Sequence, residues 1–263
     1  MTPVDAGAVE AAARLLRASA SVLFVTGAGI SADSGLPTYR GVGGLYEGDA
    51  TEEGLPLEVL LSGPMLRERP DLTWRYLGQI ERACRGARPN RAHEVIALLA
   101  RRIPRCVVLT QNVDGLHRDA GSEDVLEVHG SFHDLRCTRC QRRERVADYS
   151  RLSLPPRCPD CSGLVRPDVV LFGEPLPEAV VERLERELAL GFDAVFVVGT
   201  TAVFPYVSTP VVAARAAGAG TVEVNPGESE VSVLVGLRIR SRAAAVFDAI
   251  WSAYGRAGSE GGA

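Results

Sequence analysis

The sequence contains no lysine: all 29 of its basic side chains are arginine. Chemistry that needs an amine, such as Schiff-base catalysis or a lysine-dependent phosphate loop, is therefore excluded. The chain also lacks any apolar run near the ~20 residues that span a bilayer. Its net charge of −4 offers no broad positive surface for nucleic acid or anionic lipid. We expect neither a membrane nor nucleic acid as its partner.

Cysteine is scarce, with six residues in a chain of 263. Charged side chains at positions 5, 10, 14 and 17 interrupt the alanines and leucines of the N-terminus, a spacing typical of an amphipathic helix and not of a signal peptide. We therefore expect a cytoplasmic protein with reduced thiols, whose clustered cysteines bind metal. Cys84 and Cys106 stand alone and are expected to be small core residues.

Short apolar runs alternate with helical patterns along most of the chain. Residues 5–18 predict a helix, and the apolar run at 21–26, which ends before Gly27, is typical of a buried parallel strand. Further strands are predicted at 106–110, 194–199 and 221–225, and further helices at 91–100, 178–190 and 210–217. The alternation predicts an α/β fold with a Rossmann-like, doubly wound parallel sheet, which binds ligands at the carboxyl ends of its strands.

Two stretches interrupt this alternation. Residues 41–75 are rich in Gly, Pro and Glu, and residues 132–165 are rich in Arg, Pro and Cys. We interpret both as insertions, so that 42–75 and 132–165 form a small domain with a helical part and a metal module. The larger, Rossmann-like domain would comprise residues 1–41, 76–131 and 166–263. The Gly-rich tail at 255–263 is expected to be disordered.

Four of the cysteines form two Cys-x-x-Cys pairs separated by seventeen residues: Cys137, Cys140, Cys158 and Cys161. Each pair can form a tight turn that directs two thiolates to one point, and two such turns complete a tetrahedral zinc site. Four thiolates leave no open position for water or substrate, so we expect one structural zinc ion. A redox Cys-x-x-Cys is the alternative, although one pair would suffice for it.

A glycine-rich turn follows the first predicted strand, where residues 27–35 are Gly-Ala-Gly-Ile-Ser-Ala-Asp-Ser-Gly. Glycines at a strand-to-helix turn let backbone N–H groups approach a pyrophosphate, and Ser31 and Ser34 add hydrogen-bond donors. The dehydrogenase fingerprint needs a glycine where Ala32 stands, and an acidic residue at the end of a second strand. The turn thus favours a dinucleotide that is seated differently from that of a dehydrogenase; a tight structural turn is the alternative.

Polar residues also follow other predicted strands. Gln111, Asn112 and Asp114 come after the strand at 106–110 and can orient a ribose, a carboxamide or a water, although Asn and Asp are also common in turns and helix caps. Thr200 and Thr201 follow another strand and could contact phosphate. These ends are where we expect the ligand.

Each of the four histidines could act as a general base, because an imidazole titrates near pH ~6.5. His93 and His117 lie in predicted helices, where a structural role is expected. His129 and His133 come after the apolar run at 125–128. Spacing alone does not identify the base.

Together these motifs resemble the signature of the sirtuins, the NAD-dependent protein lysine deacylases. The resemblance covers roughly residues 20–245. Its segments, in the family's order, are residues 27–40, 111–117, 128–130, the four cysteines, 166–174, 199–201 and 224–226. One motif alone could match by chance, whereas the whole set of motifs resembles the family's set in the same order.

The resemblance implies that NAD is consumed as a co-substrate. The carbonyl oxygen of an acyl-lysine would attack the nicotinamide ribose, and nicotinamide would leave. The products would be free lysine, nicotinamide and O-acyl-ADP-ribose. The alternative functions are transfer of ADP-ribose to a protein and NAD sensing without catalysis.

The resemblance also implies roles for individual residues, with acyl-lysine proteins or peptides as partners. The histidine matching His129 would act as general base on a ribose hydroxyl, with Asn112 and Asp114 around the nicotinamide. Val170 and Phe172 would line the acyl-lysine tunnel. The expected NAD-contacting positions are Gly27, Ala28, Gly29, Ser31, Ser34, Pro37, Tyr39, Arg40, Gln111, Asn112, Val113, Asp114, His129, Gly199, Thr200, Thr201, Asn225 and Ala243.

The acyl preference depends on residues 65–90. Family members that prefer succinyl or malonyl groups carry a Tyr-x-x-Arg pair there. In this chain Tyr76 is the only tyrosine in the segment, and Gln79 stands three residues later. An anionic acyl group would lack a charge-assisted partner, which contributes ~1.5–3 kcal/mol. We therefore predict a preference for acetyl and other short neutral acyl groups.

Overall fold

The computed structural model describes residues 4–38 and 51–256. At its centre is a six-stranded sheet in which all neighbouring strands are parallel. The strands lie in the order β3 (Val125–Glu127), β2 (Arg105–Thr110), β1 (Ser21–Thr26), β7 (Ala194–Val198), β8 (Gly220–Val224) and β9 (Leu237–Ile239). The chain winds outward from β1 in one direction and from β7 in the other, which confirms the predicted doubly wound sheet and places its switch point between these two strands.

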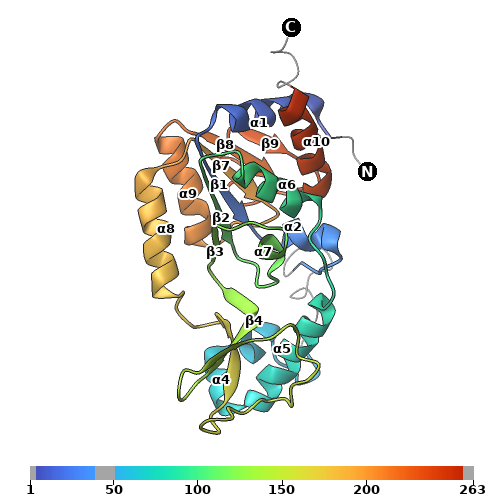
Figure 1. Ribbon diagram of the computed structural model, residues 1–263, viewed down its shortest axis with the longest axis vertical. Helices are drawn as coiled ribbons and strands as arrows, with labels where there is room; N and C mark the ends of the chain where they lie inside the picture. The colour runs from blue at the N-terminus through green and yellow to red at the C-terminus, as the bar shows by residue number, and fades with distance from the viewer. Residues whose placement is uncertain (1–3, 39–50, 257–263) are drawn as a thin grey trace.

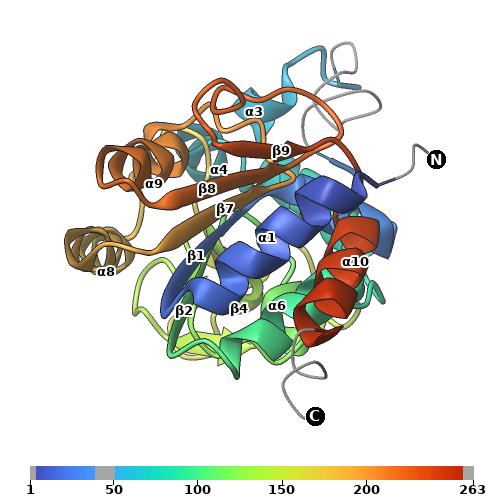
Figure 2. The ribbon, with the colours of Figure 1, turned by 90° about the horizontal axis from the view of Figure 1, so that it is seen from above.

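Helices cover both faces of the sheet (Figures 1 and 2). The helices on one face are α1 (Ala6–Ala18), α6 (Arg91–Ala100) and α10 (Ala243–Arg256), and those on the other are α8 (Glu178–Leu190) and α9 (Pro205–Ala216). Successive side chains of a strand point to opposite faces, so β1 contributes Val22 and Phe24 to the first core and Leu23 and Val25 to the second. Strands that are buried on both faces explain the continuous apolar runs in the sequence.

The sequence predicts most of these elements closely, and α9 is the main exception. The predicted start at Pro210 is wrong, because the helix begins at Pro205 and contains Pro210 in its interior. Pro205 occupies the first turn, where the missing N–H has no intrahelical partner to lose. This earlier start places Tyr206 in the first turn, beside the end of the sheet.

A smaller unit lies below the main sheet in Figure 1. It contains an antiparallel sheet with strands β5 (Arg143–Arg145), β4 (Gly130–Cys137) and β6 (Val165–Val169), and the helices α3 (Leu57–Leu60), α4 (Gly63–Glu68) and α5 (Pro70–Cys84). A shared core joins them: Trp74 is fully buried against Tyr149, and its indole N–H donates to the carbonyl oxygen of Val165 at 3.0 Å. The predicted boundary between residues 75 and 76 falls inside α5; the division into domains stays a prediction.

Three short elements lie near the carboxyl ends of β1 and β2: α2 (Ala28–Ser31), the 3₁₀ turn η1 (Ala32–Ser34) and α7 (Leu116–Asp119). They belong to the loops from which a site would be built. Across the described ranges, no helix combines the length and the apolar character needed to cross a membrane.

Candidate active site

Two loops meet at the switch point of the sheet. The N–H of Gly29 donates to the carbonyl oxygen of Gly199 at 2.8 Å, which ties the turn after β1 to the turn after β7. A Cβ at Gly29 would lie 2.7 Å from the Cα of Gly199, and a Cβ at Gly27 would lie 2.7 Å from the Cβ of Thr200. Gly199 also has a φ of +58°. These glycines are therefore required by the close approach of the two turns.

The hydroxyl of Ser31 links the two predicted nicotinamide-binding side chains. It donates to Oδ2 of Asp114 at 2.7 Å and accepts from Nδ2 of Asn112 at 3.1 Å. Asn112 also donates to the carbonyl oxygen of Gly27 at 3.2 Å, so its amide is fixed in orientation. Burial raises the pKa of Asp114, against the opposing effect of the hydrogen bonds that its carboxylate accepts from the Leu116 N–H and from Ser31. The three side chains form a preorganised polar group at the end of β2.

The imidazole of His129 is held from both of its nitrogens. Nδ1 lies 2.9 Å from the carbonyl oxygen of Gln111, and Nε2 lies 2.6 Å from the hydroxyl of Tyr206. Because a carbonyl only accepts, the ring proton is on Nδ1 and Nε2 is the basic atom. Burial lowers the pKa of His129, and the hydrogen bond to Gln111 acts in the opposite direction. The ring is therefore neutral near pH 7, the form that a general base requires.

Side chains from two strand ends converge on Thr200, which follows a third strand. Nε2 of Gln111 donates to the Thr200 hydroxyl at 2.9 Å, and Nδ2 of Asn225 donates to its carbonyl oxygen at 3.0 Å. Gln111 follows β2, Thr200 follows β7 and Asn225 follows β8. The structure thus brings together polar residues that are 89 and 25 positions apart in sequence.

These groups surround one cavity of about 450 Å³. Most of the expected NAD-binding and substrate-binding positions line it: Gly27, Ala28, Gly29, Gln111, Asn112, Val113, His129, Val170, Phe172, Gly199, Thr200, Thr201 and Asn225. Ser31, Pro37 and Asp114 line a small second cavity of about 20 Å³, which shares Ala28, Asn112 and Val113 with the first. The two cavities are therefore neighbours, as a nicotinamide site beside a ribose site would be.

Among the described residues, two expected NAD contacts do not line these cavities. Ser34 accepts a hydrogen bond from Asn90 at 2.9 Å, and Ala243 is buried at the start of α10. Neither residue lines a cavity, and their contacts to NAD stay predictions. Tyr39 and Arg40 lie outside the described residues.

An ion pair shapes the wall that carries Val170 and Phe172. Arg166, which is 4% exposed, contacts Glu174 at 2.5 Å and donates to the carbonyl oxygen of Val169 at 2.6 Å. Glu174 also accepts from the N–H of Leu171 at 3.0 Å. Burial is the largest single influence on the pKa of Glu174 and acts to raise it. The hydrogen bonds from Arg166 and from the Leu171 N–H, with the charge of Arg166, nevertheless hold this pKa below its usual value. The pair closes the loop after β6 and explains why the motif at residues 166–174 contains both charges.

The other three histidines have structural contacts, as expected for two of them. His93 and His117 are buried edge to face, with ring centroids 4.9 Å apart. Burial lowers the pKa of His93 to about 4 and also lowers that of His117. His133 contacts the carbonyl oxygen of Val146 at 3.2 Å. Of the four, His129 is the one that lines the cavity.

Sequence reasoning missed several cavity residues. Phe204 and Tyr206 stand beside His129, and Leu77 and Ile80 project from α5 into the opposite wall. The aromatic pair could have been noticed, because it follows the polar turn after β7 by only a few residues. The α5 pair had a weaker signal, since apolar residues three apart on a helix are usually core.

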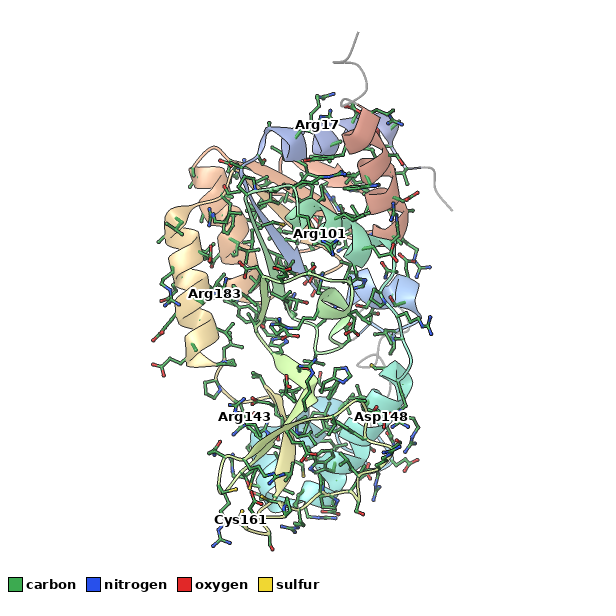
Figure 3. All side chains as sticks on the ribbon, in the orientation of Figure 1. Arg17, Arg101, Arg143, Asp148, Cys161 and Arg183 are labelled. Carbon is green, nitrogen blue, oxygen red and sulfur yellow. The ribbon has the colours of Figure 1, made fainter. Side chains whose placement is uncertain are left out.

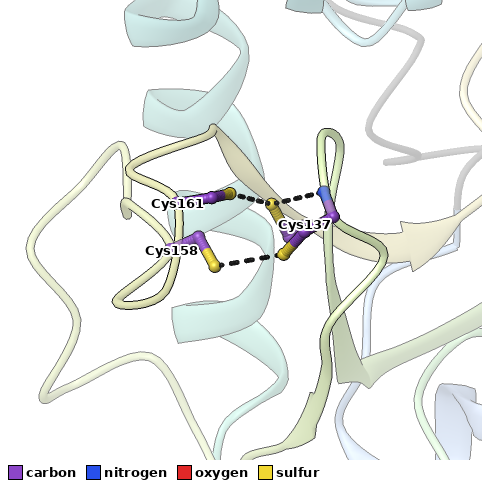
Figure 4. Close-up of side chains that lie close together, drawn as sticks. Cys137, Cys158 and Cys161 are labelled. Carbon is purple, nitrogen blue, oxygen red and sulfur yellow. Dashed lines mark hydrogen bonds between the residues drawn. The ribbon is translucent and has the colours of Figure 1, made fainter.

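The four paired cysteines form the predicted cluster (Figure 4). Their sulfur atoms all lie within 4.8 Å of one another, and backbone N–H groups of Arg139 and Cys140 point at Sγ of Cys137 from 3.3 and 3.5 Å. This is the donor set and turn geometry of a structural zinc site, so the zinc prediction fits the structure. Cys161 lies at the end of the smaller unit that points away from the main sheet in Figure 3. No cysteine of the cluster lines the cavity.

Comparison with known proteins decides the family. The model of the Sir2 family matches residues 27–205. The chain belongs to the Sir2 family. A relative from Pseudomonas aeruginosa, named NAD-dependent protein deacylase 2, is 52% identical over 238 residues, which are 89% of this chain and 93% of that protein. A NAD-dependent protein deacylase from Thermococcus kodakarensis is 39% identical over 242 residues, 89% of this chain and 91% of that one.

Solved structures of this family share the fold of the sirtuin described here. A Sir2 homologue in complex with NAD superposes with a TM-score of 0.84 and 33% identity, covering 94% of each chain. A Sir2 complex with a p53 peptide and NAD⁺ gives a TM-score of 0.77 and 29% identity, covering 95% of this chain and 96% of that one. The prediction of a sirtuin, with NAD as co-substrate and a structural zinc site, is confirmed.

Proposed function

We propose that this sirtuin, an NAD-dependent protein deacylase, removes neutral acyl groups from lysine side chains and releases nicotinamide and O-acyl-ADP-ribose. One observation carries the proposal: a single cavity joins the Gly27 turn, Asn112 and His129 to an apolar wall from the smaller unit. Its polar side suits a dinucleotide and its apolar side suits an acyl-lysine. Peptide and protein partners are supported by the p53 peptide in a related structure.

The residues at the cavity would have the following roles. When bound, NAD supplies the ADP-ribosyl group that accepts the acyl oxygen. Asn112 and Asp114, fixed through Ser31, would orient the carboxamide, and Thr200 would contact a ribose or phosphate. Nε2 of His129 would take a proton from a sugar hydroxyl. Ligands that fill the cavity would exclude water from these groups, which would strengthen each of these polar contacts.

The wall of the cavity that would face the acyl group is apolar. The carboxylate of a succinyl or malonyl group would need a cation there. Tyr76 and Gln79, the pair considered from the sequence, do not line the cavity, and the Tyr76 hydroxyl is bonded to Glu53. The i, i+3 pair that does face the cavity is Leu77 and Ile80, one residue further along α5. Among the described residues that line the cavity, none is cationic. This composition supports a preference for neutral acyl groups.

A charge placed on this wall should change the acyl preference. In Ile80→Arg, we expect the succinyl-to-acetyl ratio of kcat/KM to rise ~10–100-fold, because a charge-assisted hydrogen bond contributes ~1.5–3 kcal/mol. The measurement compares succinyl- and acetyl-lysine versions of one peptide. Ile80→Met is the matched control, since it keeps length without charge and should leave the ratio unchanged. A wild type that processes the succinyl peptide faster would refute the preference.

A further inference from the structure

The basic atom of His129 is already occupied in the free protein. Because Nδ1 carries the ring proton, Nε2 has the one lone pair in the ring plane that can accept. Tyr206 donates its hydroxyl proton to that lone pair at 2.6 Å. Any sugar hydroxyl that is to give its proton to His129 must therefore either displace this phenol or act through it.

Several contacts fix the phenol ring. Tyr206 lies in the first turn of α9 and packs, partly buried, against the core beneath α8 and α9. Phe204 stacks on it with ring centroids 5.5 Å apart and planes 8° from parallel. His129 meets both rings edge-on, at 85° to Tyr206 and 87° to Phe204. Because Phe204 stacks on its face and the core packs against its base, the Tyr206 ring is poorly placed to swing away when a ligand enters.

We propose that Tyr206 is a further catalytic residue, through whose hydroxyl His129 receives the proton of a sugar hydroxyl on the bound dinucleotide. The inference rests on the proposed function and adds a residue to its base step. The sugar hydroxyl donates to the Tyr206 oxygen while Tyr206 donates to Nε2. The sugar O–H bond and the Tyr206 O–H bond break, a new phenol O–H bond and an N–H bond form, and Tyr206 ends neutral beside an imidazolium. The freed electron pair of the sugar oxygen forms a bond to the acyl-derived carbon, while the π bond between that carbon and the lysine nitrogen breaks and its electron pair moves onto the nitrogen.

The acidity of the phenol requires the two transfers to be coupled. Burial raises the pKa of Tyr206 to about 12, so a tyrosinate would not accumulate near neutral pH. The phenol therefore passes a proton on only as it receives another. Among the described residues that line the cavity, Glu174 is the remaining titratable side chain after Tyr206 and His129. Because Glu174 is paired with Arg166, it is unsuited to replace the phenol.

Tyr206→Phe tests this step, because it removes the hydroxyl and keeps the ring. We expect the release of deacylated peptide to fall at least tenfold and by no more than the ~10²–10⁴-fold that a general base contributes. Exchange of labelled nicotinamide into NAD and the Kd for NAD should stay within twofold, since they precede the base step. Ser208→Ala is the control: its exposed hydroxyl contacts the carbonyl oxygen of Pro205 on the same helix, away from the cavity.

A second readout needs no substrate. In ¹⁵N NMR spectra of the free protein, Nε2 of His129 should show a hydrogen-bonded, unprotonated nitrogen that loses the bond in Tyr206→Phe. An unchanged Nε2 signal would overturn the proposal, as would deacylation within twofold of wild type, or exchange that falls together with deacylation. A wild type that makes no deacylated peptide would refute the proposed function as well, which distinguishes the two failures.

Discussion

Replacing His129 with alanine should reduce the release of deacylated peptide by ~10²–10⁴-fold, the usual contribution of a general base. The imidazole is the base in the cavity, and it is neutral near pH 7 because burial lowers its pKa. The measurement is the initial rate of free-lysine peptide formation from an acetyl-lysine peptide and NAD. Nicotinamide exchange should be far less affected, since nicotinamide leaves before the base acts.

His93→Ala does not serve as a control for this variant, because His93 is fully buried and close to Ser31. His133→Ala is better matched, since His133 is half-buried, lies on the next strand and has its imidazole bonded to the carbonyl oxygen of Val146, which does not line the cavity. It should keep most of the activity. Deacylation that survives in His129→Ala, with melting temperature unchanged, would contradict the assignment of the base.

Replacing Cys158 with serine should abolish zinc binding and unfold the smaller unit. A structural zinc contributes ~10–16 kcal/mol of folding free energy in small zinc-binding peptides, comparable to the ~5–15 kcal/mol stability of a whole domain. Even a third of that loss would lower Tm by roughly 10–20 °C. Activity should be lost too, because the same unit supplies the apolar wall through α5 and the loop after β6. Zinc content, Tm and turnover are the quantities to measure.

Cys106→Ala is the control for the zinc variant. Cys106 is a buried thiol in β2, and it lies outside the cluster. The variant should retain one zinc per chain and lose only the small stability of a trimmed core side chain. A Cys158→Ser protein that is free of zinc, melts with the wild type and turns over normally would show that the metal has no structural role.

The sheet was predictable because its strands are buried on both faces, which leaves an apolar run such as residues 21–26 bounded by Gly27. The cysteine cluster was predictable because the spacing itself defines the site. The helix α5 was harder: its apolar residues serve the core of the smaller unit, and no turn signal marks its start except Pro70. The α9 start was harder to predict because proline is common in the first turn of a helix, whereas Pro210 lies inside α9.

The site residues that directly follow strands were predictable, whereas those that reach the cavity through tertiary packing were not. Gln111, Asn112 and Asn225 come directly after strands, so the topology alone brings them together. Leu77 and Tyr206 reach the cavity through tertiary packing, and nothing local in the sequence marks which face of their helices points inward. Leu77 lines the cavity and Tyr76 does not, because one residue along a helix turns the side chain by about 100°.

The central claim is that this cavity couples deacylation to consumption of NAD. The most direct test is mass spectrometry of all products after incubation of the protein with NAD and an acetyl-lysine peptide. We predict deacetylated peptide, nicotinamide and O-acetyl-ADP-ribose in equal amounts. Peptide that carries ADP-ribose while it keeps its acetyl group, or NAD that remains intact beside untouched peptide, would contradict the account.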